Sequence, residues 1–213
     1  MFAILVVIAF AIAPGPGSAR GDDVVAYYSK HGTAVAWQAA IVGIALVFFI
    51  WFSETFATGT AAGSLTVVGA ALTAALYLVA VGCWEVLGET FNGSNLLEVP
   101  SESLGDAHFL YAAGVGATHM AHFTTAAYVG STAVAILASG APWRWLGRVG
   151  IVLTPICLLE AVLGLASQSG WSKDLDTVVF LAFLAWVLAT SVWLVHALQR
   201  RGLTVLDEPT RTA

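Results

Sequence analysis

Two histidines lie three positions apart, His119 and His122, in the segment GATHMAHFTT inside a long apolar stretch. In a helix, residues with this spacing point about 60° apart and therefore share one face. Glu160 interrupts a second apolar stretch further along the chain. An ionisable group costs about 2.5–3.5 kcal/mol at the centre of a membrane span, so such groups usually face other helices. We expect all three side chains to point into the protein, with at least one histidine in contact with the helix face that bears Glu160.

These residues allow three kinds of chemistry, and the sequence leaves all three open. In a structural role, His119, His122 and Glu160 hydrogen-bond between helices and fix their packing. In a proton or ion pathway, they change charge as a substrate moves, with Glu85 as a further candidate nearer the outer surface. In a metal site, two histidines and a carboxylate from another helix hold a divalent cation.

Haem is the least favoured form of a metal site, and the cofactor stays unknown. A haem held by two histidines needs them on opposing helices, whereas the spare candidates His31, His108 and His196 are expected at helix ends. The chain contains no HExxH, CxxC or GxSxG motif and no nucleotide-binding loop. Since these patterns accompany common catalytic chemistries, the sequence favours a protein that is not an enzyme.

The composition predicts a membrane protein. Of the 213 residues, 59% are hydrophobic and only 10% are charged, whereas a soluble domain carries about 25% charged residues. A spanning helix needs about 20 apolar residues, and the following stretches qualify: 32–53, 62–88, 107–137, 147–166 and 175–197. We predict one all-α domain, a polytopic transmembrane helical bundle with short loops and a cytoplasmic tail over 198–213. The expected partners are the lipid bilayer and a membrane protein or second copy, but not nucleic acid, because no large basic cluster is present.

The N-terminal stretch, 2–13, is short for a span because Pro14 and Pro16 follow it. It has the length of a signal-peptide core, and it would also result if the true start lay upstream. We favour a retained short first helix, which gives about six spans.

Basic residues predict the orientation, because they concentrate on the cytoplasmic side of a membrane protein. With six spans, one side carries Arg144, Arg148, Arg200, Arg201 and Arg211, and the other carries Arg20, Lys30 and Lys173. This bias predicts a multi-pass protein of the cell membrane with both termini in the cytoplasm.

Three segments resemble a loose group of six-span actinobacterial membrane proteins of unknown function. They are VVAYYSKHGTAV at 24–35, PWRWLGRVGIVL at 142–153 and FLAFLAWVLATSVWLV at 180–195. The resemblance implies a helical bundle in a bacterial inner membrane and implies no activity. Our leading functional hypothesis is a non-enzymatic membrane component that acts through a partner. The alternatives are a small proton-coupled carrier or ion conduit and, third, an intramembrane metal or haem protein.

Overall fold

The computed structural model describes residues 1–16, 19–60, 63–139, 143–166 and 170–206, and all regular structure in these ranges is helical. This confirms the all-α prediction. The elements in chain order are α1 (Phe2–Ile12), α2 (Gly21–Gly59), α3 (Ser64–Phe91), the 3-10 turn η1 (Leu96–Glu98), α4 (Ser101–Ala138), α5 (Arg144–Ala166) and α6 (Gly170–Leu206).

Five helices, α2 to α6, are long and apolar enough to cross a membrane. They are the five stretches predicted as full-length spans. The first helix, α1, has only 11 residues and extends about 16 Å at about 1.5 Å per residue, which is about half of a hydrocarbon core of about 30 Å. The count of six crossings therefore stays a prediction.

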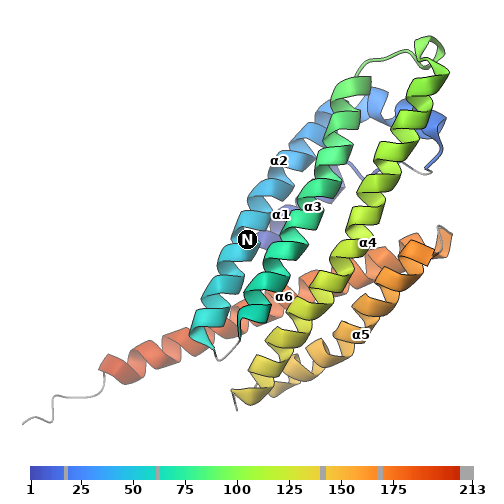
Figure 1. The fold of residues 1–213 in the computed structure, drawn as a ribbon. Coiled ribbons are helices and arrows are strands. Elements are labelled where there is room, and N and C mark those ends of the chain that lie inside the picture. The colour runs from blue at the N-terminus through green and yellow to red at the C-terminus, as the bar shows by residue number, and fades with distance from the viewer. Residues whose placement is uncertain (17–18, 61–62, 140–142, 167–169, 207–213) are drawn as a thin grey trace, which may run out of the picture.

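The helices form one bundle in which α4 is central to the packing (Figure 1). Helix α3 lies between α2 and α4, and α5 packs on the other side of α4. Helix α6 crosses behind these helices and contacts α5, α1 and α2, while α1 packs mainly on α2. This arrangement brings together α4, α5 and α6, which follow one another in the chain with short connections.

Most helices begin before the apolar stretches that predicted them. Helix α2 begins at Gly21 and carries Asp22 and Asp23 in its first turn. Carboxylates at this position stabilise a helix because they lie at the positive end of its dipole. Helix α6 begins at Gly170 and continues to Leu206, through part of the predicted tail. Charged turns therefore extend the helices beyond their apolar parts.

The core at the centre of the bundle is aromatic. The fully buried Tyr128 of α4 packs edge-on against Phe49 of α2 and Phe183 of α6, with ring centroids 5.0 and 6.3 Å away. Phe49 also stacks on Phe2 of α1 at 4.8 Å. These contacts join four helices and hold α4 in a fixed position relative to α6.

Candidate functional site

The two histidines of α4 both contact Glu160 of α5. His119 Nδ1 lies 2.9 Å from Glu160 Oε1, and His122 Nδ1 lies 2.9 Å from Glu160 Oε2. The predicted contact between the histidines and the helix face that bears Glu160 is therefore present. Glu160 is 1% exposed and His122 is 3% exposed, so both lie in the bundle interior as expected.

A fourth side chain, Asp176 of α6, joins this group. Its Oδ1 atom lies 3.0 Å from His122 Nε2, so His122 lies between two carboxylates from different helices. The Asp176 side chain is 36% exposed and connects the buried group to the surface. Sequence reasoning missed Asp176, the second residue of the predicted span 175–197, because it grouped this carboxylate with the acidic residues of the outer loops, whereas α6 begins at Gly170.

Gly164 provides the space that His119 occupies. It follows Glu160 by four residues on α5, so the two share one face of that helix. A β-carbon at Gly164 would overlap the imidazole ring of His119, whose Nδ1, Cε1 and Cγ atoms are its nearest neighbours. The missing side chain therefore allows the imidazole to lie flat against α5 and reach Glu160.

The short contacts in this group are of two kinds. The His119–Glu160 contact has the geometry of a hydrogen bond. By contrast, neither nitrogen of His122 nor Oε2 of Glu160 has a hydrogen-bond partner of acceptable geometry, although the carboxylate oxygens are only 2.9 and 3.0 Å away. The two carboxylates therefore contact His122 by proximity of charge rather than by directed hydrogen bonds.

Three ligand atoms of the group converge. One atom each from His119, Glu160 and Asp176 lie within 4.8 Å of one another, and they come from three helices. Among the alternatives that the sequence left open, the metal site used His119, His122 and Glu160 as ligands. In the structure Asp176 belongs to the converging set, and His122 contacts both carboxylates.

The remaining candidates lie elsewhere. Glu85 is exposed on α3, outside the set of ligand atoms that converge among the described residues. The ring nitrogen Nδ1 of His108 lies 2.6 Å from the Ala19 carbonyl oxygen, and the ring centroid of His31 lies 4.7 Å from that of Tyr27. The expectation that these two histidines lie at helix ends was wrong, because α2 begins ten residues before His31 and α4 begins seven residues before His108.

The fold and this group define a class of protein: an all-α helical bundle with five helices able to cross a membrane and a polar group buried among three of them. Comparison of the chain with protein-family models, with curated proteins and with solved structures finds no match. The function must therefore be inferred from the side chains themselves.

Proposed function

We propose that this protein binds a divalent transition-metal ion inside its helical bundle through His119, Glu160 and Asp176. The observation that carries this proposal is the convergence of one imidazole and two carboxylates from α4, α5 and α6, with their ligand atoms within 4.8 Å of one another. Mixed imidazole and carboxylate donors suit ions such as Zn²⁺, Fe²⁺ or Mn²⁺.

The charge of the group supports a divalent cation. Glu160 and Asp176 bring two negative charges to the bundle, and the ion-pair partners of these carboxylates among the described side chains are histidines. A charge buried without compensation is costly in a membrane. One divalent cation balances both carboxylates, whereas without a cation protons on the histidines or on the carboxyl groups must balance the charge.

The spacing of the proposed ligand atoms is close to that of a metal site. Metal–nitrogen and metal–oxygen distances of about 2.0–2.2 Å place two ligand atoms of one ion about 3.0–3.4 Å apart. The Nδ1 atom of His119 already lies 2.9 Å from Glu160 Oε1. Since all three ligand atoms lie within 4.8 Å of one another, they need to approach by at most about 1.8 Å to coordinate one ion.

His122 has a different role in this proposal. Its nitrogens contact Glu160 Oε2 and Asp176 Oδ1, so it orients both carboxylates toward His119. Side chains that hold metal ligands in place commonly contribute 10–100-fold to affinity. The partial exposure of Asp176 gives the ion a route of entry, and three protein ligands leave a position for water or a substrate.

Metal analysis of the purified protein tests this function. The detergent-solubilised protein is stripped with a chelator, dialysed against Zn²⁺ and analysed by mass spectrometry of the elements; we expect one ion per chain. Substitution of Co²⁺ should produce visible absorption bands from the coordinated ion. At a free Zn²⁺ concentration about 100 times the Kd, binding should stabilise the fold by about 2.7 kcal/mol, which a thermal unfolding curve detects.

Asp176→Asn is the most informative variant because the side chain is partly exposed and keeps its size. We expect it to lose the bound ion and the Co²⁺ bands while the apo protein remains folded by circular dichroism. Glu85→Gln is the matched control, since it neutralises an exposed carboxylate of α3 and should bind the ion normally. Wild-type protein that remains folded and binds none of Zn²⁺, Mn²⁺ or Fe²⁺ would disprove the function.

The expectations from the sequence about location, orientation, partners and relatives remain proposals in addition to the metal site. They are a bacterial cell membrane, cytoplasmic termini, a membrane-protein partner or second copy, and the similarity to actinobacterial proteins. A metal centre is compatible with each of them. The leading hypothesis of a non-enzymatic component is also compatible, because a bound ion can fix the packing of α4, α5 and α6.

A further inference from the structure

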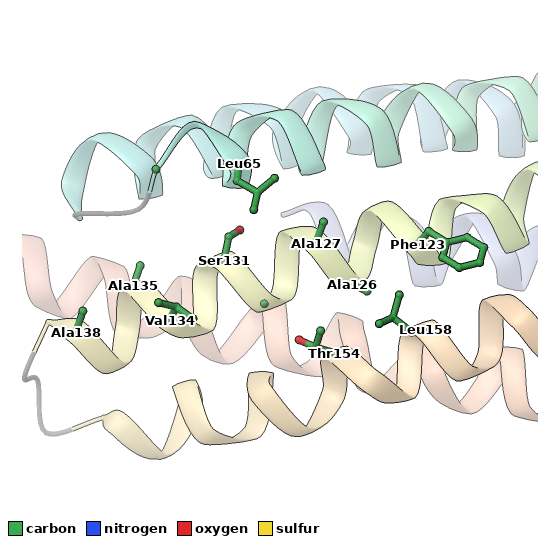
Figure 2. Close-up of a pocket in the computed structure, with 12 residues that line it drawn as sticks. Leu65, Phe123, Ala126, Ala127, Ser131, Val134, Ala135, Ala138, Thr154 and Leu158 are labelled. Atoms are coloured by element: carbon green, nitrogen blue, oxygen red, sulfur yellow. The ribbon is translucent and has the colours of Figure 1, made fainter.

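A groove runs along the outside of the bundle, away from the metal-ligand group. Helix α4 forms its floor, and its walls come from the start of α3 and from α5 (Figure 2). Its volume is about 700 Å³, and it extends from Ala138 at one end to Phe123 and Leu158 at the other. All three helices are among those able to cross a membrane, so the groove faces the bilayer.

The lining of the groove suits a hydrocarbon. Its two hydroxyl groups, those of Ser131 and Thr154, donate to carbonyl oxygens of their own helices, Tyr128 O and Gly150 O. Ser131 also accepts a hydrogen bond from Thr66 of α3 at 2.9 Å. Since the hydroxyl hydrogens are already used, the groove presents mainly apolar surface to an occupant.

The groove is longer than the acyl region of one leaflet and shorter than the whole hydrocarbon core. From Ala138 to Phe123 the α4 backbone rises about 22 Å at about 1.5 Å per residue, and half of a hydrocarbon core is about 15 Å thick. A helix of that length and about 10 Å across would occupy about 1,700 Å³, well above the volume of the groove. An extended acyl chain is thinner and fits better than a partner helix.

Basic and aromatic residues mark the Ala138 end of the groove. Arg144 and Arg148, one turn apart at the start of α5, are both exposed. Trp143 and Trp145 flank Arg144 in the sequence, with ring centroids 6.2 Å apart, and tryptophan prefers the headgroup level of a membrane. The two arginines follow the Ala138 end of the groove in the chain, at the level where a lipid headgroup would lie.

We propose that this groove binds an anionic phospholipid, with one acyl chain along α4 and its headgroup against Arg144 and Arg148. Basic pockets at the ends of membrane helices are known to recognise such headgroups. The proposal commits to a lipid rather than to a protein partner, and it is independent of the metal site.

Native mass spectrometry with two lipids tests this inference. The protein is titrated with phosphatidylglycerol and with phosphatidylcholine that carry the same acyl chains. Each arginine should contribute about fivefold to the preference for phosphatidylglycerol, the factor that about 1 kcal/mol per basic residue gives. Arg144→Gln with Arg148→Gln should remove this preference, and Lys30→Gln should not. Equal binding of both lipids by the wild type would overturn the headgroup assignment.

Groove-filling variants test the position of the acyl chain. Ala127→Phe should weaken binding of both lipids, whereas Ala75→Phe, on an exposed position of α3 outside the groove, should leave it unchanged. Val134, which is 57% exposed at the rim, gives a second variant, Val134→Trp, that covers the groove without entering the core. Lipid binding that survives both substitutions would contradict the proposal. The proposal would also be wrong if the protein forms a dimer that Ala127→Phe abolishes, because the groove would then be occupied by a second copy of the chain.

Discussion

At the scale of single residues, Gly164 is required for the metal-ligand group although it contributes no side chain. Because a β-carbon there would overlap the His119 ring, Gly164→Ala should push the imidazole away from Glu160. We expect Zn²⁺ affinity to fall about 10–100-fold, the usual effect of disturbing a ligand's surroundings. Overpacking should also cost about 1–3 kcal/mol of stability. Competition with a chelating dye measures the affinity, and thermal unfolding measures the stability.

Gly116→Ala is the matched control for this prediction. Gly116 lies on α4, three residues before His119, and a β-carbon there meets nothing within 4 Å. The same substitution should therefore leave metal binding unchanged. If both glycine variants weaken binding equally, the effect reflects altered helix propensity and not the position of His119.

The cost of burying charge explains which site residues the sequence could predict. His119, His122 and Glu160 lie in apolar stretches, and the free-energy penalty of exposing them to lipid was sufficient to predict their contact. Asp176 lies at the edge of an apolar stretch, where a carboxylate can face water at little cost in free energy. The sequence therefore offered no reason to expect its side chain to point into the bundle. The role of Gly164 depends on the distance between α4 and α5, which could not be predicted from the sequence.

At the scale of helices, apolar length predicted five spans well and their ends poorly. A run of about 20 apolar residues is required by the thickness of the bilayer, but a helix is free to continue into the interface and beyond. Helix α4 therefore begins at Ser101, directly after Pro100, although its apolar part was predicted from 107. The same effect in α6 made Asp176, which was grouped with the acidic residues of the outer loops, a member of the site.

The interface between α3 and α4 contains two hydroxyl bridges of the same design. In one, Thr124 Oγ1 donates to the Ala121 carbonyl of its own helix, which leaves Thr73 to donate to Thr124 across a distance of 2.8 Å. In the other, Ser131 donates to the Tyr128 carbonyl while Thr66 donates to Ser131. Each bridge therefore contributes one hydrogen bond between the two helices.

A double-mutant cycle with Thr73→Val and Thr124→Val measures one of these bonds. Interhelical hydrogen bonds in membrane proteins average about 0.6 kcal/mol and reach about 1.7 kcal/mol, so we expect a coupling energy in this range. The free energies of unfolding come from denaturation in mixed micelles. The control cycle, Thr66→Val with Thr124→Val, joins residues of different bridges and should show coupling near zero. A coupling of zero in the first cycle would mean that the Thr73–Thr124 bond contributes nothing to stability.

At the scale of the whole molecule, the metal-ligand group and the lipid groove use different faces of the same helix. The buried face of α4 carries His119 and His122, whereas its groove face carries small residues such as Ala127 and Ala138. Helix α5 likewise presents Glu160 to the interior and Thr154 to the groove. The position of α5 relative to α4 therefore affects both sites, so occupation of one can in principle alter the other.

The topology of the whole molecule gives the last prediction. Helix α4 has 38 residues and extends about 57 Å, so its two ends lie on opposite sides of a bilayer if it crosses one. Leu97, in η1 before α4, is 92% exposed, and Ser139 follows its other end. The excess of arginine after α4 predicts that Ser139 lies in the cytoplasm. Accordingly, Leu97→Cys should react with a membrane-impermeant maleimide on intact cells, and Ser139→Cys should react only after lysis.

The parent chain provides the control for this labelling. Its own cysteines, Cys83 and Cys157, lie within α3 and α5, so they should stay unlabelled by a reagent confined to water. Labelling of Ser139→Cys alone on intact cells would reverse the orientation that the arginines predict. Labelling of both variants on intact cells would show that α4 does not cross the membrane, and then neither the buried metal site nor the lipid-facing groove could be placed as proposed.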